Sequence, residues 1–249
     1  MRSDIPFADL PPPRKPRRRS PSRRRRRLPK PPSFLRQAFW GLMKAVLIVA
    51  APFVLLIRGA VLLHNRYHWH AWPAVAAAVL ATALLLLIYF AVVQQRLGRD
   101  RGDKIVWRRR FFIALLLVGT YSLYGLLYLS ADHAKDAAVR AQFHDLNPIL
   151  RLGVSTAVMF DRSLLITDAS RLPEDYRRMG LPTARHSLHY RQSNGYTHAI
   201  DLRTRHRSWV RNQLLRLFFA ALGFNTLRHV GTADHLHVSL SSHDRPGAI

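Results

Sequence analysis

SLHYRQSNGYTHAIDL (Ser187–Leu202) and DHLHVSL (Asp234–Leu240) are the two stretches that decide the fold of the C-terminal half of the chain. Together they supply two histidines and one aspartate, His189, Asp201 and His237. A catalytic zinc ion takes three protein ligands of these types and keeps a fourth position for water. Asp234 precedes His237 by three residues, so we expect its carboxylate to stand beside that water as a proton acceptor. These residues predict a zinc hydrolase.

Two further histidines in these stretches bear on the site. His235 and His237 face the same side of a strand, because side chains alternate along it. We therefore expect His237 to coordinate the metal and His235 to orient the water or a substrate carbonyl. His198 is the alternative to His189 as a ligand. It lies three residues before Asp201, and residues three apart in an extended strand face opposite sides, so this pair requires a bulge.

The charge of the chain indicates a membrane as its partner. The sequence has 249 residues, with 39 Lys and Arg against 14 Asp and Glu, a formal net charge of +25. Such an excess is typical of proteins that bind nucleic acid or anionic membranes. Most of it lies in two blocks that flank apolar runs, residues 1–30 and 94–110, which favours the membrane. The chain has no cysteine, which excludes a disulfide framework and a thiolate metal site.

Residues 1–36 form a basic arm that contains PPPRKPRRRSPSRRRRRLPKPP. Proline and arginine at this density cannot build a core, so the arm is predicted to be disordered. We expect it in the cytoplasm beside anionic lipid. Binding of nucleic acid by the arm is the alternative interpretation.

Residues 37–130 contain three apolar segments that predict transmembrane helices. Trp72–Val93 and Phe111–Ser130 are uncharged and long enough to cross a hydrocarbon core about 30 Å thick. The segment at 39–63 is interrupted by Lys44 and Arg58, which we expect near opposite faces of the bilayer with their charged ends reaching water.

Charge also predicts the orientation of these spans. The arm and the loop at 94–110 are both strongly basic and are expected in the cytoplasm. The loop HNRYHWHA between the first two spans has one arginine and is expected outside. Three spans then leave the C-terminus outside, which predicts a protein of the bacterial cytoplasmic membrane with a periplasmic or extracellular domain. In HNRYHWHA we favour an interfacial belt of aromatic residues and histidine over a metal cluster of His64, His68 and His70.

The part from Ala131 onward predicts a small α+β domain with an antiparallel sheet. We expect a linker at 131–146, the domain at 147–242 and a tail at 243–249. Hydrophobic periodicity and turn residues predict the following elements in order: a helix at Asn147–Phe160, a strand at Ser163–Thr167, a strand at HAIDL, a helix at Ser208–Leu222 ended by Gly223, and a hairpin of Asn225–Val230 with Leu236–Leu240.

The order SLHY, AIDL, an apolar helix ending in Gly-Phe, and an HxHV strand resembles one zinc-peptidase superfamily. It comprises D-alanyl-D-alanine carboxypeptidases and dipeptidases, penicillin-insensitive murein endopeptidases and the amino-terminal domain of hedgehog proteins. The resemblance covers the C-terminal domain alone, and its specific part is Ser187–Leu240. It implies that the zinc ligands are His189, Asp201 and His237.

The same resemblance implies roles for three more residues. Asp234 takes the place of the catalytic acid and base, where the carboxypeptidase branch has glutamate, and His235 is its neighbour. Upstream, LLITDASRLPEDY resembles the family's strand-then-arginine segment, which makes Arg171 the residue that grips a substrate carboxylate or carbonyl. One departure is the spacing of the first histidine and the aspartate, which is twelve residues here and seven in the family pattern.

The expected function is a membrane-anchored zinc peptidase that cleaves the stem peptides of peptidoglycan or of its lipid-linked precursor, without a nucleic-acid partner. The alternative is a non-catalytic domain that keeps zinc for structure and binds cell wall or protein. A third interpretation, a membrane-tethered nucleic-acid binder, requires the arm to carry the function.

Overall fold

The computed structural model of the chain describes residues 34–97, 104–180, 182, 186–231 and 234–248. Nearly all of the basic arm predicted at 1–36, and residues 98–103 of the predicted cytoplasmic loop, lie outside the described residues. The chain divides into two units, residues 1–42 and 43–249. All contacts discussed below lie within the second unit.

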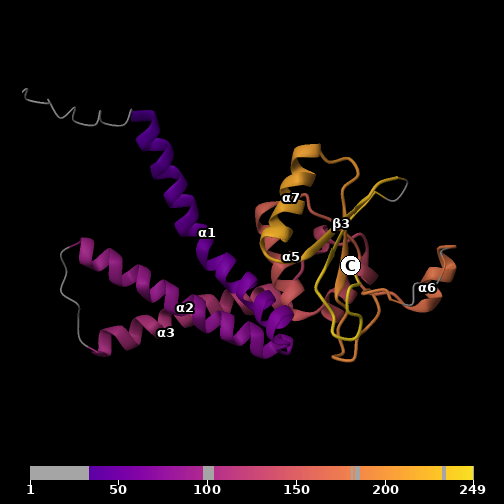
Figure 1. The fold of residues 1–249 in the computed structure, drawn as a ribbon, viewed down its shortest axis with the longest axis horizontal. Helices are drawn as coiled ribbons and strands as arrows, with labels where there is room; N and C mark the ends of the chain where they lie inside the picture. Colours follow the sequence, from indigo (N-terminus) through magenta and orange to yellow (C-terminus); the bar gives the residue numbers. More distant parts are fainter. Residues whose placement is uncertain (1–33, 98–103, 181, 183–185, 232–233, 249) are drawn as a thin grey trace, which may run out of the picture. The chain divides into compact units, whose positions relative to one another are not determined.

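Three helices are long and apolar enough to cross a membrane by length and composition (Figure 1). They are α1 (Phe34–Tyr67), α2 (Ala71–Arg96) and α3 (Lys104–Leu127). The three predicted spans are thus confirmed as long apolar helices. The interrupted segment at 39–63 lies within α1, which is continuous through Pro52. The loop between the first two spans is shorter than predicted, because α1 extends to Tyr67 and α2 begins at Ala71.

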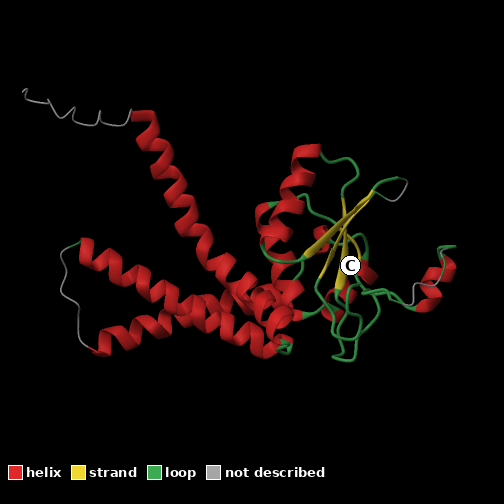
Figure 2. Cartoon of the chain, viewed as in Figure 1, coloured by secondary structure: helices red, strands yellow, loops and turns green. Residues whose placement is uncertain are grey.

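The remaining described residues build a small domain around a four-stranded antiparallel sheet, as predicted (Figure 2). The strand order is β1-β2-β4-β3, and every neighbouring pair is antiparallel. The strands are β1 (Ile166–Asp168), β2 (Ala199–Arg203), β3 (Asn225–His229) and β4 (His235–Ser239). The helices are α4 (Ala137–Gln142), α5 (Pro148–Phe160), α6 (Pro173–Arg178) and α7 (Trp209–Ala221), with short 3-10 turns at Ala131–His133 and Phe143–Asp145.

Local sequence explains where the two core helices begin and end. Asn147 caps α5, because its side-chain oxygen accepts a hydrogen bond of 3.0 Å from the backbone N–H of Ile149. Ser208 caps α7 in the same way. Gly223 follows α7 with a φ of +92°, a left-handed conformation that glycine adopts without a steric penalty. Both helices therefore lie where the sequence predicts them.

One face of the sheet is buried in the core and the other carries the polar residues. Ile200 and Leu202 of β2 and Val238 of β4 are fully buried in the core. The same core includes apolar side chains of α5 and α7, which lie on one side of the sheet in Figure 2. Because side chains alternate along a strand, the intervening residues of β2 and β4 face the opposite side. The candidate site lies on that second face.

The segment at 131–146, which the sequence predicts as a linker, is folded in the structure. Phe143, Leu146 and Val139 of α4 are buried. The backbone N–H of Lys135 donates a hydrogen bond of 2.9 Å to the carbonyl oxygen of Ile166 in β1. The segment therefore packs on the sheet edge and does not act as a loose tether.

The domain packs directly against the long helices. Ser155 of α5 donates a hydrogen bond of 2.7 Å to the carbonyl oxygen of Gly125 in α3. Arg58 of α1, which is exposed, donates one of 2.9 Å to the carbonyl oxygen of Ala221, where the end of the α7 dipole is negative. These contacts fix the domain at the end of α3 and alongside α1.

The histidines of HNRYHWHA take part in the same packing. His64 is buried at the end of α1, and its ring lies 5.6 Å from that of His198 and 5.1 Å from that of His243. His68 pairs with His243 through their Nδ1 atoms, 2.9 Å apart. These rings thus join the α1–α2 connection to the C-terminal segment of the domain.

Candidate metal centre

Two of the predicted ligands are brought together by the register of the sheet. Asp201 of β2 lies directly opposite His237 of β4, so both side chains project from the same face. His189 comes from the loop before β2. Its position is fixed by backbone hydrogen bonds on both sides, from Arg171 N–H to the His189 carbonyl at 3.0 Å and from His198 N–H to the Leu188 carbonyl at 2.9 Å. The twelve-residue spacing between His189 and Asp201 is therefore accommodated by a loop that returns along the strand.

The three side chains converge through one atom each. His237 Nδ1 lies 2.8 Å from Asp201 Oδ1, His189 Nε2 lies 3.3 Å from Asp201 Oδ1, and the two ring nitrogens lie 3.3 Å apart. Two ligands of a tetrahedral zinc ion, each about 2.0–2.1 Å from the metal, lie about 3.3–3.4 Å apart. The group His189, Asp201 and His237 is thus placed to hold a metal ion, with the ligand types that zinc prefers.

The surroundings of His189 and Asp201 favour the forms of these side chains that bind a metal. His189 Nδ1 lies 3.2 Å from the carbonyl oxygen of Ala169 and donates to it, which leaves the lone pair on Nε2 facing the group. The three residues are only 2–7% exposed. Burial alone would raise the pKa of Asp201, but His189 and His237 beside it hold that pKa well below its usual range. The carboxylate therefore stays ionised, as a metal ligand must.

Arg171 lies beside the group and binds the aspartate. Its Nη2 donates to Asp201 Oδ2 at 2.5 Å, and its Nε donates to Asp168 Oδ2 at 2.5 Å. Although burial lowers the pKa of Arg171, Asp201 and Asp168 raise it above its ordinary value. Because Arg171 holds one carboxylate oxygen of Asp201, the other is directed at the two histidines. Arg171 thus orients a ligand in the structure, whereas the resemblance implies that it grips substrate.

Asp234, expected as the catalytic base, is not brought to the group. Its carboxylate accepts hydrogen bonds from Arg228 Nε at 2.8 Å, Arg228 Nη2 at 2.7 Å and Thr204 Oγ1 at 2.7 Å. Arg228 lies opposite Leu236 in the register of β3 and β4, and so on the face away from His237. The hydrogen bonds from Arg228 lower the pKa of Asp234, which makes it a poor proton acceptor.

His235 lies on the same face as the group, as the alternation of β4 predicts. Its Nε2 is 3.6 Å from Asp201 Oδ1, and its side chain is 21% exposed, so it links the buried group to solvent. His229 of β3 stacks on it with ring centroids 4.7 Å apart. Burial, and then the neighbouring His235, lowers the pKa of His229. Sequence reasoning missed His229. It lies within the predicted hairpin strand Asn225–Val230, and the register of β3 and β4 places it directly opposite His235.

His198, the alternative ligand, serves a different part of the structure. Its Nδ1 donates to the carbonyl oxygen of Ser241 at 3.1 Å, and its Nε2 accepts from the side-chain amide of Asn194 at 2.9 Å. Burial, together with the nearby His64, lowers the pKa of His198 to about 4. Both ring nitrogens of His198 are therefore engaged by neighbours within the domain, and the ring is neutral. His189 is left as the candidate for the first ligand.

In comparisons with models of protein families, with curated proteins and with solved structures, nothing matched this chain.

Proposed function

We propose that this chain is a membrane-anchored, zinc-dependent hydrolase. Its substrates would be the stem peptides of peptidoglycan or of its lipid-linked precursor, outside the cytoplasmic membrane of a bacterium. The observation that carries the hydrolase proposal is the convergence of His189 Nε2, Asp201 Oδ1 and His237 Nδ1 within 3.3 Å of one another. The two separations of 3.3 Å match those of tetrahedral zinc ligands, and the third, 2.8 Å, is a hydrogen bond that a bound metal would replace. The substrate class rests on the superfamily resemblance and on the packing of the domain against the three long apolar helices.

Zinc bound by these three residues would lower the pKa of a coordinated water and polarise the scissile carbonyl. In the proposal, His235 accepts the proton of the attacking water and returns it to the leaving amine, because its Nε2 lies beside the group and its ring reaches solvent. His229, stacked on His235, holds that ring in place. Arg171 keeps Asp201 oriented. Asp234 stays in its ion pair with Arg228 and takes no part in the chemistry.

The engagement of Asp234 also favours a second candidate function. If proton transfer in this domain required a carboxylate at that position, its bidentate pairing with Arg228 would leave the domain without a base. The chain would then be a non-catalytic, zinc-containing domain that binds cell-wall peptide or another protein.

Hydrolysis by the full-length, zinc-loaded protein separates these functions. The assay is release of D-alanine from a stem peptide that ends in D-Ala-D-Ala, together with mass analysis of cross-linked muropeptides. We expect turnover by the wild type, a loss of at least about 100-fold in His235→Ala with zinc retained, and rates within a few-fold of wild type in Asp234→Asn. His186→Ala, at an exposed histidine, is the control for loss of an imidazole.

Three results would change this conclusion. A loss confined to Asp234→Asn would return the role of base to that residue. Stoichiometric zinc without turnover on any muropeptide would support the non-catalytic domain. A protein that binds no zinc would contradict both functions.

A further inference from the structure

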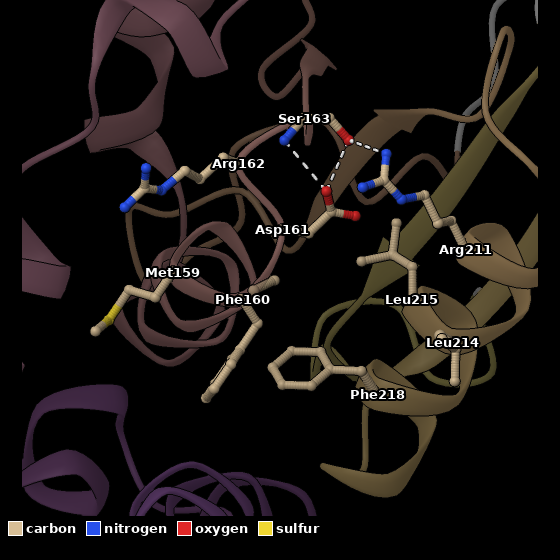
Figure 3. A pocket seen from close by; sticks show the side chains of 10 residues that line it. Met159, Phe160, Asp161, Arg162, Ser163, Arg211, Leu214, Leu215 and Phe218 are labelled. Atoms are coloured by element: carbon tan, nitrogen blue, oxygen red, sulfur yellow. Dashed lines mark hydrogen bonds between the residues drawn. The ribbon is translucent and has the colours of Figure 1, made fainter.

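Away from the candidate metal centre, a groove of about 780 Å³ runs between the end of α5 and one side of α7 (Figure 3). This volume is in the range of about 300–1,000 Å³ that is usual for ligand sites. Its floor and walls include the large apolar side chains of Met159, Phe160, Leu214 and Phe218. Three of these are exposed although apolar, Met159 at 52%, Phe160 at 70% and Leu214 at 60%.

The groove continues onto a helix long and apolar enough to span a membrane. Phe160 and Phe218 also line a second hollow of about 290 Å³, whose other wall is the α1 segment that includes Phe53 and Val54. The one polar side chain in that hollow is Thr156, whose hydroxyl donates to the Leu152 carbonyl at 2.7 Å and is thereby satisfied. Phe160 and Phe218 therefore line both hollows, and the apolar surface of the groove adjoins the side of α1 at these two rings.

The far end of the groove is polar and positively charged. In Figure 3 the Arg211 guanidinium lies beside Ser163, whereas the Arg162 side chain is on the opposite side of the groove and extends away from Asp161 and Ser163. The Asp161 carboxylate is engaged by Arg207 and by the Ser163 hydroxyl, the latter at 2.7 Å. Arg211 Nη1 donates only to the Ser163 hydroxyl, at 3.4 Å. Across the described part of the chain, no carboxylate pairs with Arg162 or Arg211, so both cations are available to an anion.

We propose that this groove binds an acidic glycerophospholipid of the surrounding bilayer. An acyl chain would enter from the side of α1 and lie along Phe160 and Phe218. The phosphate would bind Arg211 at the polar end of the groove, and the exposed Arg162 side chain would turn toward it. Arginine pairs are well suited to phosphate, because the planar guanidinium donates two parallel hydrogen bonds. Apolar contact on one side and cations on the other match the two ends of such a lipid, as in basic lipid sites beside transmembrane helices.

This site is separate from the proposed hydrolase and needs no metal. It would fix the depth of the domain at the membrane surface, because α5 and α7 both contribute to the groove and to the core beneath the sheet. The lipid would thus hold the metal-binding face at a constant height above the bilayer.

The test is native mass spectrometry of the full-length protein, stripped of lipid in detergent and titrated with phosphatidylglycerol or phosphatidylcholine of identical acyl chains. The variant is Arg162→Gln with Arg211→Gln. The control, Arg205→Gln with Arg216→Gln, removes the same charge from exposed positions outside the groove. The N-terminal arm is the same in both variants, so lipid bound by the arm contributes equally, and the difference between the two variants isolates the groove.

We expect one phosphatidylglycerol per chain to bind at least about tenfold more tightly than phosphatidylcholine. This preference should be kept in the control and lost in the groove variant, with zinc content unchanged in both. Glycerol phosphate, which has the phosphate without the chains, should not compete. Equal phosphatidylglycerol binding by the two variants would overturn the proposal. Full competition by glycerol phosphate would also overturn it. So would a lipid-free wild-type protein that is a dimer, if the groove variant is a monomer, because a second copy of the chain would then occupy the groove.

Discussion

Replacing Arg171 with glutamine removes the cation that balances the most deeply buried carboxylate of the candidate site. Asp201 is 2% exposed, and Arg171 Nη2 lies 2.5 Å from its Oδ2. Removing one partner of a buried ion pair costs about 3–5 kcal/mol, because the other charge is left uncompensated. Asp168, the second carboxylate on Arg171, is 23% exposed and regains water, so it adds little. For a chain of this size, about 2–4 °C per kcal/mol gives a fall of about 6–20 °C in Tm.

Thermal unfolding of the full-length protein in detergent, followed by tryptophan fluorescence, measures this loss. The fall in Tm caused by Arg171→Gln should be largest with a chelator present and smaller with zinc, because a divalent cation facing Oδ1 of Asp201 partly compensates for the missing guanidinium. Arg203→Gln, at an exposed arginine of the same strand, is the control and should change stability by less than about 0.5 kcal/mol. If Arg171→Gln in chelator unfolds within about 2 °C of wild type, Arg171 does not hold Asp201 and is free to bind substrate, as the resemblance implies.

Three further predictions follow from other parts of the molecule. Burial lowers the pKa of His198 to about 4 in the folded state. In the unfolded state the same imidazole becomes protonated near pH 6.5. The free energy of unfolding should therefore fall by about 3 kcal/mol as the pH drops from about 6.5 to about 4. This dependence should be absent in His198→Gln. If the variant and the wild type lose the same stability over this pH range, the pKa of His198 is not lowered. Gly153→Ala should destabilise by about 1–3 kcal/mol in denaturant unfolding, because an added Cβ lies 2.8 Å from the ring of Phe224; full stability would mean that this ring moves aside. A C-terminal alkaline phosphatase fusion should be active and a green fluorescent protein fusion dark, and the reverse would place the domain in the cytoplasm.

Much of the fold could be predicted because it depends on local signals. The cap at Asn147, the helix stop at Gly223 and the alternation in HAIDL each act within a few residues of the element they define. The segment at 131–146 could not be recognised as folded in this way. Its buried side chains, such as Val139 and Phe143, are few and lack a helical or strand period, and they are held by contact with β1.

The site was predictable where it depends on strand geometry. Alternation along one strand places His235 on the same face as His237, as predicted. Asp201 meets His237 because β2 and β4 are neighbours, and this pairing is seen only in the structure. Asp234 lies just before β4, and its carboxylate is held by Arg228 and Thr204. The role of Arg171 depends on which oxygen of Asp201 it contacts, and that contact arises only in the folded chain.

The metal content of the purified full-length protein tests the central claim most directly. After loading with zinc and removal of free metal by gel filtration, elemental analysis by mass spectrometry should give one zinc per chain. His189→Ala and His237→Ala should abolish stoichiometric zinc, whereas His198→Ala, which removes an equally buried imidazole, should retain it. Full zinc in His189→Ala together with loss in His198→Ala would contradict the account, because the loop before β2 would then present the wrong histidine to Asp201.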